Sequence, residues 1–232
     1  MKSRLQALLQ AALLVAPGPA VASECVVLLH GLGRTQLSMM LLEYSLEKAG
    51  YTVWNGGYPS RRDTVERLAP VVGEAIEACR AHRPAKIHFV THSLGGILVR
   101  HYFRDHAVAQ AGRVVMLAPP NRGSAIVDAN RARWWFRWFT GPAGQQLGTA
   151  AGSLPNTLPP LALEVGIIAG RFDGKVSVAS TALPGMKDHL VVDSAHTFIM
   201  NSPTVIRQVK AFLKDGEFEK TPVAPEGAPT KP

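Results

Sequence analysis

The sequence predicts an α/β protein in which helices cover both faces of a mostly parallel, doubly wound β-sheet. Short, continuous apolar runs such as residues 25–29 and 87–91 are typical of strands buried on both faces. Longer segments with apolar residues at helical spacing separate these runs, and strands that alternate with helices form parallel sheets. With 232 residues, 47% of them hydrophobic, the chain is long enough for one domain with one sizeable core.

The strands are expected to be short, apolar and parallel. We place them at residues 25–29, 51–54, 87–91, 113–118, 164–169 and 189–192. The carboxyl ends of parallel strands meet at one edge of the sheet, and proteins of this class carry their sites at that edge. Polar residues that directly follow these strands are therefore the first candidates for a functional site.

The helices are expected between the strands. Two of them are placed at residues 36–49 and 97–103. A third begins at Asp63, which can cap it, and is kinked by Pro70. The last helix starts at Ser202 and Pro203, a capping residue followed by a residue suited to a first turn, and ends before Gly216.

The two ends of the chain differ in character from the predicted domain, which should occupy residues 24–215. Residues 1–23 have the three parts of a secretory signal peptide, namely a basic start, a short apolar run and small residues before a cleavage site. The apolar run is too short to span a bilayer. We therefore expect export to the periplasm or the cell exterior. Residues 216–232 are rich in Pro, Glu and Lys, and are expected to form a disordered tail.

Export makes the two cysteines, Cys25 and Cys79, candidates for a disulfide bond. Cys25 opens the first strand, and Cys79 ends the helix that leads into the strand at 87–91. Right-handed connections make these two strands neighbours, which places both cysteines at the edge opposite the strand carboxyl ends. A disulfide is therefore the expected state, with two buried free thiols as the alternative. The cysteines have no spacing typical of a metal site, and we expect no metal.

The chain carries a net charge of +8, but its lysines and arginines form no single basic block. No nucleic-acid-binding motif accompanies this charge, so we expect no nucleic-acid partner. The charge is compatible with attraction to an anionic membrane or lipid surface.

Ser93 lies where the strand at 87–91 must end. Gly95 follows closely and allows the next helix to start near the strand, because glycine has no Cβ to collide with it. A strand, a sharp turn with a serine and then a helix is the context of a nucleophile elbow, G-x-S-x-G. Residues 91–95 read Thr-His-Ser-Leu-Gly, so Thr91 replaces the first glycine. The alternative is an ordinary turn serine.

A serine nucleophile needs a base that accepts its proton and a carboxylate that orients the base. Asp173 follows the strand at 164–169, and His196 follows the strand at 189–192. The order serine, acid, histidine is the one found with the nucleophile elbow. Asp188 and Asp193 are rivals for the acid.

Other polar residues near the same edge have weaker claims. His189 lies at the start of its strand and not after its end, which makes it a poor base. Ser124 lacks an elbow-type turn. His92 and His30 are expected to support their loops.

These segments together resemble bacterial α/β-hydrolases of the lipase/esterase class, similar to small secreted triacylglycerol-lipase-like proteins and more distantly to GPI-inositol deacylases. The matching segments are residues 27–34, 90–96, 117–124, 173–176 and 194–196. The resemblance implies an α/β-hydrolase fold, with Ser93 as nucleophile, Asp173 as acid and His196 as base. It also implies oxyanion-hole amides at Leu32 and Leu94, ester or lipid substrates, and no metal or organic cofactor.

Residues 121–160 separate two core strands by more than a normal loop and are expected to form an insertion over the strand ends. Trp134, Trp135 and Trp138 lie there on a basic helix. They suggest a lid or a wall for the acyl chain, and the alternative is a capping helix with buried tryptophans.

The leading functional hypothesis is a secreted serine carboxylic-ester hydrolase that works through an acyl-enzyme on Ser93. Two alternatives remain open at this point. The same triad could serve an acyltransferase or an amidase, or the chain could be a non-catalytic lipid- or partner-binding module on a hydrolase scaffold.

Overall fold

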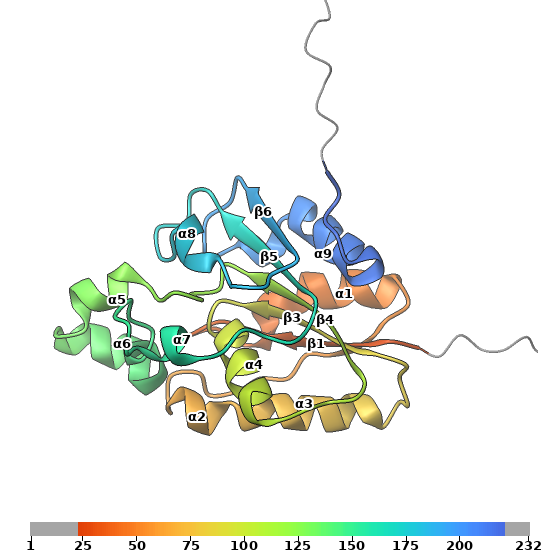
Figure 1. Cartoon of the computed structure of the whole chain (residues 1–232), viewed down its shortest axis with the longest axis horizontal. Coiled ribbons are helices and arrows are strands. Elements are labelled where there is room, and N and C mark those ends of the chain that lie inside the picture. The colour runs from red at the N-terminus through yellow and green to blue at the C-terminus, as the bar shows by residue number, and fades with distance from the viewer. Residues whose placement is uncertain (1–22, 221–232) are drawn as a thin grey trace, which may run out of the picture.

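The computed structural model describes residues 23–220, and this part of the chain forms a six-stranded parallel sheet with helices on both faces (Figure 1). The strands are β1 (Cys25–Leu29), β2 (Thr52–Trp54), β3 (Ile87–His92), β4 (Ala111–Leu117), β5 (Val165–Gly170) and β6 (Asp188–Val192). Their order across the sheet is β2-β1-β3-β4-β5-β6, and every pair is parallel. The predicted fold class is therefore confirmed.

Helices of very different length connect the strands. They are α1 (Met40–Lys48), α2 (Val65–Leu68), α3 (Pro70–Arg80), α4 (Leu94–Asp105), α5 (Ala125–Asn130), α6 (Trp134–Gln145), α7 (Leu154–Thr157), α8 (Val178–Thr181) and α9 (Pro203–Asp215). Short 3₁₀ helices occupy Gln36–Met39 and Ile199–Asn201. Within residues 23–220, no helix has the length and apolar character needed to cross a membrane.

The core consists of two apolar layers, one on each face of the sheet, because successive strand residues point to opposite sides. In β1, Val27 packs with residues of α3 and α4, whereas Val26 and Leu28 pack with residues of α1 and α9. The continuous apolar sequence of β1 thus reflects burial on both faces. In Figure 1, α3 and α4 lie on one side of the sheet and α1 and α9 on the other.

The sheet register brings several strand ends to one edge. Leu29 pairs with Thr91, His92 with Leu117, and Gly170 with Val192. The insertion that contains α5, α6 and α7 lies at the end of the molecule toward which β1 runs (Figure 1). It therefore lies beside the edge from which the candidate site residues emerge.

Two helix starts differ from the predictions. The helix expected from Asp63 is two helices, α2 and α3, and Thr64 precedes the first of them without a side-chain capping bond. Asp63 instead pairs with Arg67 at 3.4 Å, because it lies one residue too far upstream to cap the helix. The helix expected at residues 97–103 begins earlier, at Leu94, because the turn at Ser93 leads directly into it. Gly95 and Gly96 are part of this helix.

The domain extends past the predicted boundary at residue 215. Gly216 ends α9 in the left-handed conformation, with a φ of 79°. Beyond it, Phe218 is buried against Phe212, and its N–H donates to the Asp188 carboxylate at 2.9 Å. The chain therefore still packs on the domain at Phe218 and at Glu219, whose N–H donates to Gln208. The expected signal peptide, apart from Ser23, and the rest of the expected tail, residues 221–232, lie outside the described residues.

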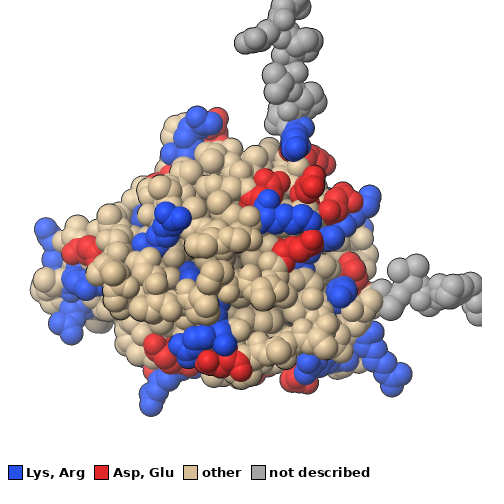
Figure 2. Space-filling view, in the orientation of Figure 1, with Lys and Arg blue, Asp and Glu red and all other residues tan. Residues whose placement is uncertain are grey.

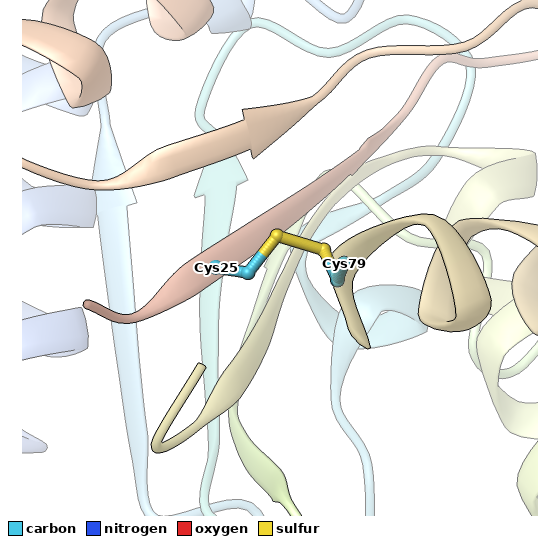
Figure 3. The surroundings of a disulfide bond; sticks show 2 residues. All are labelled: Cys25 and Cys79. Carbon is cyan, nitrogen blue, oxygen red and sulfur yellow. A yellow bond between two sulfur atoms is a disulfide. The ribbon is translucent and has the colours of Figure 1, made fainter. Parts of the chain in front are cut away.

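Cys25 and Cys79 are joined by a disulfide bond, as expected (Figure 3). The bond links the first residue of β1 to the last turn of α3, with a Cα–Cα distance of 5.8 Å. Both cysteines are buried. Because Cys25 is at the amino end of its strand, the disulfide lies at the edge opposite the candidate site.

Candidate active site

Ser93 occupies a sharp turn between β3 and α4. Its φ of 52° and ψ of −116° are unusual for a residue with a side chain, and such conformations cost about 1–3 kcal/mol. Backbone hydrogen bonds hold the turn, since the Ser93 N–H donates to Leu117 at 2.9 Å and the Gly96 N–H donates to Ser93 at 3.0 Å. Strain of this kind is concentrated at functional positions, and the turn has the form expected of a nucleophile elbow.

Glycines allow the segments around Ser93 to approach one another closely. A Cβ on Gly95 would lie 2.7 Å from the carbonyl oxygen of Leu29 at the end of β1. A Cβ on Gly31, in the loop after β1, would lie 2.6 Å from Nδ1 of His92 and 3.2 Å from Cβ of Ser93. The loop after β1 therefore packs directly against the elbow.

Gly96 explains how the turn accommodates Thr91 in place of glycine. Thr91 is fully buried, and a Cβ on Gly96 would lie 3.3 Å from its Oγ1. The helix thus leaves room for the β-branched side chain by having no side chain of its own at this position.

Ser93, His196 and Asp173 lie in one hydrogen-bonded chain. His196 Nε2 is 3.0 Å from Ser93 Oγ, and His196 Nδ1 is 2.6 Å from Asp173 Oδ2. An ionised carboxylate only accepts, so Nδ1 carries the imidazole proton and Nε2 accepts from the serine hydroxyl. The three residues come from three different loops, after β3, β5 and β6. The structure therefore brings together the serine, acid and histidine predicted from the sequence.

Asp173 is fixed by its own loop. Its side chain is 1% exposed, and Oδ1 accepts hydrogen bonds from the N–H groups of Lys175 at 2.8 Å and Val176 at 2.9 Å. Burial by itself would raise the pKa of this carboxyl, but the hydrogen bond and charge of His196 and the two N–H donors together hold the pKa below its usual value. The carboxyl is thus kept ionised and oriented toward His196.

The rival acids are occupied elsewhere. Asp188, at the start of β6, accepts from the N–H groups of His189 and Phe218. Asp193 pairs with Arg171 at 2.7 Å, and both side chains are largely exposed.

The alternative base, His189, and the alternative serine, Ser124, form hydrogen bonds with other residues. His189 Nε2 is 3.0 Å from Thr181 Oγ1. Ser124 Oγ donates to the Lys175 carbonyl at 2.6 Å, although this residue also lines the cavity in front of Ser93.

The two histidines near the elbow support the loops. His92 is buried, and its Nε2 lies 3.0 Å from the His196 carbonyl oxygen. Burial, followed by the nearby His196, lowers the pKa of His92 well below its usual value, so the ring is neutral. His30 stacks on Tyr58 with ring centroids 4.1 Å apart, and burial lowers its pKa as well. His30 thus packs within its loop, as expected, whereas His92 also lines the cavity in front of Ser93.

The predicted oxyanion-hole residues flank Ser93. Leu94 is the first residue of α4, and a first helical residue has no carbonyl partner for its N–H within the helix. Leu32 follows the close-packed Gly31 and lines the same cavity as Ser93. Leu94 thus follows the serine directly with a free helix-start N–H, and Leu32 lies on the wall of the same cavity.

A cavity of about 290 Å³ opens in front of Ser93 and His196. Its apolar wall comes from the loop after β1, the insertion and the loop after β5. These wall residues are Leu32, Ile126, Val127, Phe136, Phe139, Leu147 and Val176. The cavity can therefore hold a hydrocarbon chain next to the serine.

The three tryptophans expected to form a lid or substrate wall do not line this cavity. Trp134 and Trp138 are 80% and 70% exposed, and Trp135 is also exposed. The opposite face of α6 supplies the wall through Phe136, Phe139 and Thr140. The spacing of those residues, three and four positions apart, is the helical signal that could have identified the inward face from the sequence.

No cluster of three or more His, Cys, Asp or Glu side chains that could hold a metal ion occurs between residues 23 and 220. The site consists of the serine, the histidine, the carboxylate, the flanking backbone amides and the apolar cavity. Together these groups can activate a hydroxyl nucleophile and stabilise a developing oxyanion.

The fold resembles solved structures of hydrolases. Mature lipase BlEst2 of Bacillus licheniformis superimposes with a TM-score of 0.67 at 18% identity, covering 86% of this chain and 94% of that one. Phospholipase PlaB of Legionella pneumophila gives 0.63 at 19% identity, covering 81% of this chain and 57% of that one. Lipase B of Aspergillus fumigatus gives 0.66 at 14% identity, covering 83% and 52%. At these identities the likeness concerns the fold alone.

The sequence has no match among the curated proteins with which it was compared. A family model described as "Alpha/beta hydrolase family" matches residues 26–214, which include the three hydrogen-bonded site residues and all of the sheet except the first residue of β1. The chain is therefore a member of the alpha/beta hydrolase family.

Proposed function

We propose that the protein is an exported serine carboxylic-ester hydrolase with Ser93, His196 and Asp173 as its catalytic triad. The observation that supports this most directly is the hydrogen-bonded chain from Ser93 Oγ through His196 to Asp173, at 3.0 and 2.6 Å, with the serine on a strained turn. The Asp173 carboxylate accepts from one nitrogen of His196, and the other nitrogen accepts from the Ser93 hydroxyl, as a catalytic triad requires.

The reaction would proceed in two halves. Ser93 Oγ attacks the ester carbonyl carbon while its proton passes to His196 Nε2, and the N–H groups of Leu32 and Leu94 stabilise the oxyanion. His196 then protonates the alkoxide as the ester C–O bond breaks, which leaves an acyl group on Ser93. Water, deprotonated by His196, attacks this acyl-enzyme, and the proton returns to Ser93 as the carboxylic acid leaves.

The apolar cavity supports an ester with a hydrocarbon acyl chain as substrate. Phe136 and Phe139 line the cavity on one face of α6, while Trp134 and Trp138 project into solvent on the other. We propose that the exposed tryptophans contact a lipid surface, because exposed aromatic residues favour membrane interfaces. The neighbours described as lipases and as a phospholipase are consistent with this substrate class.

Export is proposed on the sequence of residues 1–23 and is consistent with the disulfide, since disulfides persist in oxidising compartments. Cell fractionation of the expressed full chain, followed by N-terminal sequencing, tests it. We expect a processed protein that starts at Ser23 or Glu24. An unprocessed protein confined to the cytoplasm would contradict export.

The activity is tested with p-nitrophenyl esters of increasing chain length. Wild type should release the phenol, with a preference for chains that fill the cavity, and Ser93→Ala should be inactive. Ser124→Ala is the matched control, because Ser124 is a second buried serine on the same cavity wall. It should retain most of the activity. Loss in the control but not in Ser93→Ala would contradict the proposal.

The same assay separates hydrolysis from acyl transfer. With increasing concentrations of an added alcohol or amine, a hydrolase should still give mainly the free acid. Predominant formation of a new ester or amide would assign the protein as an acyltransferase that uses the same residues.

The two faces of α6 can be tested separately. Trp134→Ala/Trp138→Ala should lower activity on vesicles more than activity on soluble esters. Phe139→Ala should alter chain-length preference on soluble esters. Equal losses on both substrates in the tryptophan variant would contradict the proposed lipid contact.

A further inference from the structure

A second hollow adjoins the cavity in front of Ser93. It is an open groove of about 610 Å³ formed by the loop after β1, the segment between β2 and α2, and Trp138 of α6. Arg34 lines both the groove and the catalytic cavity. A molecule could therefore extend from one into the other past this residue.

Three arginines line the groove, Arg34, Arg61 and Arg62. No carboxylate of the described residues lines it, and none of the three arginines forms an ion pair with an acid in residues 23–220. The neighbouring acid, Asp63, is paired with Arg67. The groove is thus a concentration of positive charge without a compensating negative charge.

The wider charge distribution agrees with this local one. Figure 2 shows Lys and Arg over the end of the molecule that carries α5 and α6, with few acidic side chains among them. The acidic side chains visible in this view lie mostly toward the other end. At the end that carries α5 and α6, few carboxylates thus offset the basic side chains on this face.

Contacts between neighbouring segments of the chain fix the backbone around the groove. The Gly33 N–H donates to Ser60 Oγ at 3.0 Å, which joins the loop after β1 to the segment before Arg61. Gly141, with a φ of 62°, packs so closely on the Arg61 backbone that a Cβ there would collide with it. Arg34 donates to the Thr197 carbonyl at 3.4 Å and lies over the Phe198 ring, beside the His196 loop. The backbone that carries Arg61 is thus held in place, and the Arg34 side chain is anchored beside the His196 loop.

We propose that this groove binds a phosphate ester group of the substrate, so that the preferred substrates are acyl esters that also carry a phosphate. This rests on the proposed ester hydrolase function. The planar guanidinium forms paired hydrogen bonds to phosphate oxygens, and a phosphate has enough oxygens to engage more than one arginine. The acyl chain would occupy the apolar cavity, with the phosphate beyond Arg34 and the ester carbonyl at Ser93.

The experiment uses two soluble, monomeric substrates that differ only in the phosphate, monobutyrylglycerol and monobutyrylglycerol phosphate. The readout is the ratio of kcat/KM for the phosphorylated ester over that for the neutral ester. Wild type should give a ratio of about ten or more, the effect expected of a charge-assisted hydrogen bond. Arg61→Gln/Arg62→Gln should bring the ratio close to one, mainly through the KM of the phosphorylated ester.

A control variant separates the groove from overall charge. Lys48→Gln/Lys214→Gln removes the same number of positive charges from the last turns of α1 and α9, outside the groove. It should leave the ratio at the wild-type value. An equal fall of the ratio in both variants would show long-range attraction and overturn the groove as a site.

Three outcomes distinguish the sources of failure. Hydrolysis of neither ester would refute the proposed function. Hydrolysis of both with a ratio near one in wild type and in Arg61→Gln/Arg62→Gln would refute the groove and leave the hydrolase intact. A lower affinity of that variant for phosphatidylglycerol vesicles, with an unchanged ratio on soluble esters, would make the arginines a membrane contact and also refute the groove.

Direct binding gives a readout that does not depend on catalysis. Calorimetry of wild type with glycerol phosphate should show binding that Arg61→Gln/Arg62→Gln weakens about tenfold. Binding of inorganic phosphate as tight as that of glycerol phosphate would indicate a site for free anions and contradict a substrate subsite.

Discussion

His92 Nε2 donates a hydrogen bond to the backbone carbonyl of His196, over 3.0 Å. The carbonyl can only accept, so the proton of the neutral His92 ring is on Nε2. The residue before Ser93 is thereby linked to the residue that contacts Ser93 Oγ. Because this bond joins the elbow to the loop that carries His196, we expect it to help fix the position of His196 Nε2 relative to the serine oxygen.

Removal of this bond should slow the reaction more than it weakens substrate binding. His92→Leu keeps apolar bulk but leaves the His196 carbonyl without its donor, which we expect to lower kcat about tenfold with little change in KM. His92→Gln can place an amide donor near the position of Nε2 and should recover part of the rate. A lower melting temperature with unchanged kcat in His92→Leu would assign His92 a purely structural role.

The choice of acid is tested by two isosteric substitutions. Asp173→Asn removes the charge that holds His196 in the required tautomer, and losses on such triads reach about ten-thousand-fold in kcat. Asp193→Asn breaks only the exposed pair with Arg171 and should leave kcat within about a factor of two. Steady-state kinetics on a short-chain ester measures both. A larger loss in Asp193→Asn would move the acid to the other aspartate.

The two glycines after Ser93 should respond differently to alanine. Gly95→Ala places a methyl group 2.7 Å from the Leu29 carbonyl oxygen, which belongs to the backbone and cannot move aside easily. We expect it to destabilise the fold by about 1–3 kcal/mol and to displace Ser93. Gly96→Ala meets only side chains, at 3.3 Å or more, and these must shift by a few tenths of an ångström, so we expect a smaller cost than for Gly95→Ala. Urea unfolding and kcat measurements report both effects, and the reverse order would contradict the packing around the elbow.

Buried neutral histidines should make the protein less stable in mild acid. The pKa of His92 and that of His30 are lowered in the folded state, while the unfolded chain takes up protons near the ordinary value of 6.5. Stability is therefore fully present above pH 6.5 and declines as the pH falls below it, by up to about 1.4 kcal/mol per pH unit for each histidine. The lowered pKa of Asp173 adds a separate loss only below its ordinary value of 3.8.

Urea unfolding between pH 7.5 and 4.5 measures this decline. His92→Gln keeps a donor but cannot titrate, so its stability should fall less steeply over this interval. His106→Gln, at an exposed histidine, should keep the wild-type slope. Identical slopes in all three proteins would exclude His92 as a source of the acid sensitivity.

The sheet and the three central site residues could be predicted because their signals are local and independent. Apolar runs bounded by glycine or polar residues define the strands, and parallel strands must present their carboxyl ends at one edge. Ser93, Asp173 and His196 each follow such an end, so the fold brings them together once the strand order is fixed. The disulfide followed from the same topology.

Features that depend on packing could not be predicted in the same way. Trp134 and Trp138 have the hydrophobicity of a cavity wall, but the direction of each side chain depends on how α6 rests on the domain. Phe218 lies in a segment of tail-like composition and is buried because the end of α9 places it beside Phe212. The bond from His92 to His196 spans 104 positions of the chain and leaves no pattern in the sequence.

Mapping a fluorophosphonate adduct tests most directly whether Ser93 is the nucleophile. The probe loses fluoride as an activated serine oxygen bonds to phosphorus, and mass spectrometry of the digested protein locates the adduct. In the wild-type protein we expect one adduct, on the peptide that contains Ser93, and slower labelling in Asp173→Asn. Ser93→Ala should remain unlabelled while keeping the circular dichroism of wild type. Labelling that persists in Ser93→Ala, or an adduct on Ser124 in wild type, would contradict the assignment of Ser93.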